Sequence, residues 1–145
     1  MAGNKKPRKK YRRMVIYTTS NPLPITMGIT AEMKTELQLP PHLILEAFKN
    51  GAGTEEGAHT LAAAVNLGAV MARTQPQEVR DVMEAALHAM HAVMRRGQGN
   101  VWGMSGPEMT AIGEGLALAN DMQDISTRRD LRNAIATVYR EGAYA

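Results

Sequence analysis

Residues 54–74 read Thr54-Glu-Glu-Gly-Ala-His-Thr-Leu-Ala-Ala-Ala-Val-Asn-Leu-Gly-Ala-Val-Met-Ala-Arg-Thr74. Thr54 and the two glutamates after it are typical of a helix start, because a Thr hydroxyl caps free amides and carboxylates favour the positive end of a helix. The remainder is apolar on nearly every side. Its polar residues His59, Asn66 and Arg73 recur every seven residues and so share one stripe. A helix with so narrow a polar stripe is typical of the centre of a bundle, and the stretch therefore predicts an all-α protein.

Two shorter helices are predicted before this stretch. Thr30 can cap the first of them, with Glu32 in its positive first turn. The pair Pro40-Pro41 is expected to end that helix, and Pro41 suits the first position of the next one. Asn50-Gly51 then stops the second helix.

Three more helices are predicted after the central stretch. The first covers 75–96 and carries a coiled-coil-like apolar seam. The members of this seam are Val79, Met83, Ala86, Met90 and Val93. The second opens with the capping box Ser105-Gly-Pro-Glu108, and a break near 125–126 separates it from the last helix, which ends at Gly142. We expect a single-domain bundle of about five or six helices.

Small residues recur on one side of the central helix. Ala64, Gly68 and Ala72 lie four residues apart, and small side chains allow another backbone to come close. The neighbour can be a helix of the same chain or a second subunit, and the sequence leaves both alternatives open.

Charge is divided unevenly along the chain. Residues 1–13 hold seven cations and no anion, whereas the rest of the chain holds 10 Lys and Arg against 14 Asp and Glu. High charge without apolar spacing predicts a basic disordered arm over 1–13. Residues 14–29 contain β-branched residues and two prolines, which predict an extended strap over the helices or a short edge strand. The helical bundle is then expected over 30–145.

Composition excludes several classes of protein. The chain has no cysteine, which excludes disulfides, thiolate nucleophiles and sulfur-ligated zinc. The longest nearly apolar stretch, 61–72, is too short to cross about 30 Å of hydrocarbon. The basic start is not followed by the apolar region of a signal peptide. We therefore expect no membrane partner and a cytoplasmic location.

Side chains that could support catalysis or bind a metal do not form a convincing set. Glu84, His88 and His91 share a helical face with the spacing of a carboxylate–histidine metal site, but the apolar seam of that helix predicts that they point outward. His59 has no suitable nucleophile. The glycine-containing stretch 97–106 lacks the features of a phosphate loop. We predict that the protein is not an enzyme and uses no metal or cofactor.

The arm offers the strongest candidate site. Its cations can neutralise phosphates, and Tyr11 can stack on an unpaired base. The predicted nucleic-acid-binding residues are Lys5, Lys6, Arg8, Lys9, Lys10, Tyr11, Arg12 and Arg13. No spacing implies base-specific readout, so we expect contacts to the nucleic-acid backbone. A merely solubilising tail is the alternative.

A secondary basic patch is predicted near the C-terminus. It consists of Arg128, Arg129, Arg132 and Arg140. The last three can share one face of the final helix. Nearby carboxylates can pair with some of them: Asp121, Asp124 and Asp130. We therefore favour a solvated, salt-bridged surface, with an extension of the basic footprint as the alternative.

The opening Asn4-Lys-Lys-Pro-Arg-Lys-Lys-Tyr-Arg12 resembles the start of a group of short phage and prophage proteins of unassigned function. That group is also similar around Ser105-Gly-Pro-Glu108 and the apolar helix after it. Arg13 stands where the group leads us to expect a proline. The resemblance implies an accessory protein of a mobile element, and it transfers no active site.

These observations lead to one expected function and two alternatives. We expect a phage-type accessory protein in the host cytoplasm that binds nucleic acid, or a nucleoprotein, non-specifically through the arm. The helical body is expected to form a homo-oligomer or to recognise a partner. The alternatives are a protein–protein inhibitor or adaptor that acts on host machinery such as defence systems, and a structural component of a virion.

Overall fold

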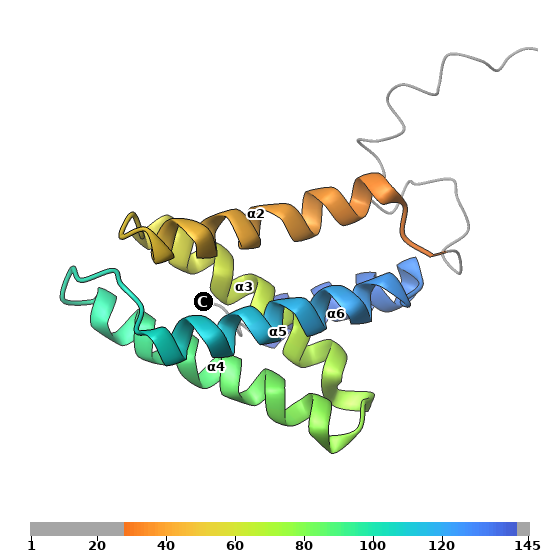
Figure 1. Ribbon diagram of the computed structural model, residues 1–145. Coiled ribbons are helices and arrows are strands. Elements are labelled where there is room, and N and C mark those ends of the chain that lie inside the picture. Colours follow the sequence, from red (N-terminus) through yellow and green to blue (C-terminus); the bar gives the residue numbers. More distant parts are fainter. Residues whose placement is uncertain (1–27, 142–145) are drawn as a thin grey trace, which may run out of the picture.

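The computed structural model describes residues 28–141, and this part of the chain is an all-α single domain (Figure 1). Its elements are α2 (Ala31–Lys49), α3 (Glu55–Met71), the 3-10 turn η2 (Ala72–Thr74), α4 (Gln77–Gly97), α5 (Gly106–Asp124) and α6 (Arg128–Glu141). The prediction of a helical bundle is confirmed. Residues 1–27 and 142–145 lie outside the described part, and so does most of the predicted strap. None of the helices in 28–141 has the length and apolarity that crossing a membrane requires.

The predicted central helix is α3. It packs against α2, α4, α5 and α6, and Figure 1 shows it crossing behind α5 between α2 and α4. Leu61 and Val65 are fully buried in this position. The members of the polar stripe differ in exposure: His59 and Arg73 are exposed, whereas Asn66 is 8% exposed and donates from Nδ2 to the Ala62 carbonyl at 2.9 Å. Its amide is satisfied within the helix, which makes its burial tolerable.

Two glycines allow the three inner helices to come close. A Cβ atom on Gly68 of α3 would lie 2.7 Å from the Met83 Cε and 2.8 Å from the Ala119 Cβ. A Cβ atom on Gly115 of α5 would lie 2.5 Å from the Ala86 Cβ of α4. Both contacts are shorter than carbon atoms tolerate. The close neighbour of α3 at Gly68 is therefore internal, which resolves the alternative that the sequence left open at this position.

The predicted faces of α4 are confirmed. Met83, Ala86, Met90 and Val93 are each at most 1% exposed, and Val79 is half-buried beside them. The opposite stripe is exposed throughout: Arg80, Glu84, His88, His91 and Arg95. This outward orientation leaves the carboxylate and imidazoles of α4 in solvent.

The two predicted helices before α3 are one helix, which corrects our expectation. Pro40 and Pro41 lie inside α2, although neither can donate to the carbonyl four residues before it. Met33 on one side of the prolines, and Leu45 and Phe48 on the other, are buried in the two apolar clusters of the bundle. Tertiary packing at both ends thus keeps the helix continuous where local propensity would break it.

We expect Pro40→Ala to raise the free energy of unfolding by about 1–2 kcal/mol. Alanine restores an amide donor inside α2, and Pro40 is exposed, so little packing is lost. The expected gain in stability is smaller than the roughly 3 kcal/mol that proline costs inside a helix. The reason is that alanine makes the unfolded chain more flexible, which stabilises the unfolded state. Pro41→Ala is the control, since Pro41 is buried and its loss of packing should reduce the gain. Urea unfolding measures both, and a destabilised Pro40→Ala variant would contradict this account of α2.

The capping box at the start of α5 is confirmed. The Ser105 Oγ accepts from the Glu108 amide at 3.3 Å, and the Glu108 Oε1 accepts from the Ser105 amide at 2.9 Å. Arg96 of α4 adds two bonds to the same carboxylate, at 2.5 and 2.9 Å. These Arg96 bonds, followed by those from Ser105, lower the pKa of Glu108 from 4.5 to about 2. The carboxylate therefore joins the end of α4 to the start of α5.

Glu108→Gln is expected to lower the free energy of unfolding at pH 7 by about 1–2 kcal/mol. Because the folded pKa lies below 4.5, the charge stabilises the protein above that pH and loses its effect as pH falls toward 2. The expected loss of stability is smaller than the pKa shift alone would give, because the Arg96 side chain is 41% exposed and solvent screens its charge. Glutamine still completes a capping box, so the change isolates the charge. Chemical unfolding at pH 7 and pH 3 tests this, and an equal difference between wild type and variant at both values would refute it.

Candidate nucleic-acid interface

The main predicted site lies outside the described residues. This holds for all of its members: Lys5, Lys6, Arg8, Lys9, Lys10, Tyr11, Arg12 and Arg13. What the structure does place is the point where the chain joins the bundle, at Gly28. The secondary basic patch on α6 is described in full. The site is therefore built from Gly28 and α6.

The first described residues are fastened to the start of α6. Gly28 forms an isolated antiparallel bridge with Thr127, the residue that precedes α6. Ile29 packs on an apolar cluster that includes Met33 and Leu131. The last two residues of the predicted strap thus lie on the helices. The segment that leads to the arm joins the body next to the N-terminus of α6.

Thr127 and Asp130 form the cap of α6. The Asp130 amide donates to the Thr127 Oγ1 at 3.1 Å, and the Thr127 amide donates to the Asp130 Oδ2 at 3.4 Å. This reciprocal pair satisfies donors at the start of the helix, as a capping box does. It also occupies the Asp130 carboxylate. Asp130 was expected to be close enough to pair with an arginine, and this cap was not predicted.

α6 carries the positive charge of the body. This helix contains four arginines and two acidic residues, Asp130 and Glu141, which gives it a net charge of +2. Of the other helices in residues 28–141, α4 is neutral and α2, α3 and α5 are negative. The chain therefore joins the bundle beside the start of its one net-positive helix.

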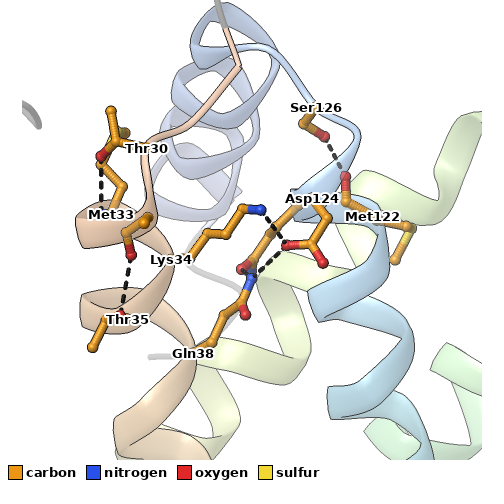
Figure 2. Close-up of polar contacts among 10 residues, drawn as sticks. Thr30, Met33, Lys34, Thr35, Gln38, Met122, Asp124 and Ser126 are labelled. Atoms are coloured by element: carbon orange, nitrogen blue, oxygen red, sulfur yellow. Dashed lines mark hydrogen bonds and ion pairs between the residues drawn. The ribbon is translucent and has the colours of Figure 1, made fainter.

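The arginines of α6 are not neutralised by the nearby acids, contrary to the interpretation we favoured. Within residues 28–141, none of them forms an ion pair. Asp124 instead lies 3.5 Å from the Lys34 Nζ and accepts from the Gln38 Nε2 at 3.4 Å (Figure 2). Gln38 also donates to the buried Gln123 at 3.0 Å. Asp124 therefore links α5 to α2 and does not pair with the arginines of α6.

Three of the four patch residues form an exposed face. Arg129, Arg132 and Arg140 are exposed, as predicted. Arg140 donates to the Thr137 Oγ1 at 3.2 Å, and its charge adds to the bonds from Arg73 that lower the pKa of the adjacent Glu141. Such cations can reach phosphates without first breaking an ion pair.

Arg128 differs from the predicted surface residue. It is only 6% exposed, and its Nε and Nη1 atoms have no hydrogen-bond partner. The sequence did not predict this burial. A charged residue at the start of a helix is normally solvated. The patch therefore consists of an exposed trio and a buried, unpaired cation.

Most of the other cations in the bundle are occupied by carboxylates. Arg73 donates two bonds to Glu141, at 2.7 and 3.0 Å, and these lower the pKa of Glu141. Arg96 is bound to Glu108, and Lys49 lies 3.7 Å from Glu46. The exposed arginines Arg80 and Arg95 of α4 form no ion pair within 28–141, but that helix is neutral as a whole.

His59 and His42 each have one polar partner within residues 28–141. His59 is exposed and lies 3.7 Å from Glu55, one turn away on α3. His42 shares a 2.7 Å hydrogen bond with Asn120. Within residues 28–141, no three His, Asp or Glu side chains are grouped in a way that could hold a metal ion.

Sequence reasoning missed two hollows on the described part of the surface. A polar cavity of about 440 Å³ lies where the end of α3 and η2 meet the α5–α6 turn. An apolar groove of about 370 Å³ is lined by α2, α3 and α6. Its apolar lining is Leu37, Pro40, Pro41, Ala63, Ala64, Leu67, Ile135, Val138 and Tyr139. We expected Pro40-Pro41 to end a helix, and for this reason we did not predict that a continuous α2 forms one side of the groove.

Neither a protein-family model, nor a curated protein, nor a solved structure matches this chain. The resemblance to short phage proteins therefore stays a prediction, and functional inference depends on the residues themselves.

Proposed function

We propose that the protein binds nucleic acid, or a nucleoprotein, non-specifically through its basic N-terminal arm. The arm supplies phosphate contacts through its seven cations, and Tyr11 stacks on an unpaired base. The exposed arginines of α6 extend this basic footprint along the bundle. A phage-type accessory role in the host cytoplasm follows only if the resemblance of the N-terminus reflects descent.

The observation that supports this proposal most is the bridge between Gly28 and Thr127. It brings the attachment point of the arm segment to the helix whose cations are free of ion pairs. Fourteen residues separate Arg13 from Gly28, and an extended chain of that length reaches up to about 50 Å. The two basic clusters can therefore act on one polyanion.

Binding to labelled single- and double-stranded oligonucleotides tests the proposal. A variant whose seven arm cations are glutamines should bind both probes much more weakly than wild type and keep only the salt-sensitive contacts of α6. Tyr11→Ala should weaken only single-strand binding, by about 5-fold or more, because only unpaired bases expose a face for stacking. A chain with the order of residues 4–13 permuted is the matched control. It keeps the charge, so its affinity should stay close to that of wild type. Unchanged binding by the glutamine variant would refute the proposal.

The apolar groove favours a second function, a protein–protein inhibitor or adaptor that acts on host machinery such as defence systems. Tyr139 of the groove is 67% exposed, and Leu39 and Leu43 on α2 are 49% and 60% exposed. Exposed apolar side chains beside a groove are typical of a partner surface. A specific complex that survives arm neutralisation but is lost with Tyr139→Glu would favour this function over nucleic-acid binding.

A further inference from the structure

The charge of Arg128 has no ion-pair partner within residues 28–141. A guanidinium keeps its charge under all conditions in which a protein folds, and burying it without an anion is costly. All fourteen Asp and Glu residues of the chain lie within 28–141, and none of them pairs with Arg128. Residues 1–27 and 142–145 contain no acidic side chain. The carboxylates of residues 28–141 therefore leave Arg128 unpaired, and a bound anion is a candidate partner for it.

The position of Arg128 indicates where that anion would bind. Arg128 is the first residue of α6, and side chains of a helix tilt toward its N-terminus. The amides there carry the positive end of the helix dipole. The Thr127–Asp130 cap uses the Asp130 amide and leaves those of Arg128 and Arg129 without an acceptor in the described part. Arg128, whose Nε and Nη1 atoms are buried and unpaired, thus begins a helix whose first two amides have no acceptor in the described part.

The surrounding charges favour a phosphate over a carboxylate. Arg132 is one turn further along and about 40° around the axis from Arg128, so the two are neighbours. Arg129 is the next residue. Asp130 lies about 160° around the axis from Arg128, and its carboxylate is engaged with Thr127. Three cations near one helix end match a polymer with repeated anionic groups, such as the phosphates of a nucleic acid, better than a single carboxylate.

We propose that Arg128, together with the first amides of α6, binds a phosphate group, and that Arg129 and Arg132 contact the same polyanion. The proposal rests on the proposed function for the source of that phosphate, which is the backbone of the bound nucleic acid. It adds a fixed contact on the bundle to the mobile contacts of the arm. The Gly28–Thr127 bridge places this contact where the arm segment joins the bundle.

Thermal unfolding of the full chain tests the site, with inorganic phosphate replacing chloride at constant ionic strength. Phosphate should raise the midpoint for wild type, because a ligand that binds only the folded state stabilises it. Arg128→Met should unfold at the same or a higher temperature than wild type in chloride, since it removes a buried unpaired charge. It should also lose the specific response to phosphate. Arg95→Met, which changes an exposed arginine without an ion pair, should respond as wild type does.

A second measurement keeps the proposal testable if Arg128→Met folds poorly. The Nε–Hε signal of Arg128, assigned by its absence in Arg128→Lys, should shift in the spectrum of wild type when phosphate is added. An Arg128 signal that ignores phosphate, or an unchanged phosphate response of Arg128→Met, would overturn the site.

Oligonucleotide binding separates this inference from the proposed function. Arg128→Met should bind a short oligonucleotide about tenfold or more weakly than wild type, and Arg95→Met should not. If wild type binds the oligonucleotide and Arg128→Met binds equally well, the site is wrong and the arm proposal stands. If wild type binds no oligonucleotide but Arg128 still responds to phosphate, the proposed function is wrong and the anion site stands.

Discussion

Gly115→Val is expected to lower the free energy of unfolding by about 3 kcal/mol or more. The added Cβ would lie 2.5 Å from the Ala86 Cβ, which belongs to the body of α4 and cannot rotate away. Relief requires α4 and α5 to separate. That movement would disturb Met83, Met90 and Leu116, which are at most 2% exposed. Urea unfolding followed by circular dichroism measures the loss.

Gly113→Ala provides a matched control on the same helix. A Cβ at this position would lie 3.6 Å from the Leu45 Cδ2, an ordinary van der Waals contact. The variant should gain helix propensity and become more stable by about 0.5–1 kcal/mol. If both glycine variants changed stability by the same amount, close approach at Gly115 would not be the cause of the loss.

The second large effect is the dependence of nucleic-acid binding on salt. Each neutralised phosphate of a duplex contributes about −0.9 to the slope of log affinity against log salt concentration. Seven arm cations therefore give a slope of about −6, and the affinity should fall by about 10³–10⁴-fold between about 50 and 200 mM salt. This is an upper limit that assumes that all seven cations pair. Loss of the exposed α6 arginines should reduce the slope by less, because that face has three of them: Arg129, Arg132 and Arg140.

Nucleic-acid binding that barely changes over this salt range would contradict the arm as its main source. A steep slope for wild type that persists in a protein with glutamines on α6 would show that the arm acts alone. In that case the α6 face would not be part of the footprint.

Much of the bundle was predictable because its signals are local. The seam Val79 to Val93 and the box Ser105 to Glu108 each depend on residues within one helix, and the structure confirms both. Pro40-Pro41 misled the prediction because the packing that overrides it lies in other helices, against Met33 and Phe48. The burial of Asn66 could not be predicted from its spacing, since a buried amide that is satisfied by its own helix has the same spacing as an exposed one.

The candidate site was less predictable, because it depends on contacts between distant segments. The patch residues on α6 were identified from their spacing, but their freedom from ion pairs depends on where Asp124 and Asp130 are engaged. Lys34, which takes Asp124, is ninety residues away in the chain. The bridge from Gly28 to Thr127 and the burial of Arg128 likewise have no local signal.

The salt dependence of duplex DNA binding, measured side by side for wild type and for the variant with seven arm glutamines, tests the central claim most directly. The account predicts a slope of about −6 to −9 for wild type, from the arm cations together with α6, and about −3 or shallower for the variant, whose remaining contacts come from α6. Equal slopes, or a wild-type protein that does not bind DNA or RNA at low salt, would contradict it.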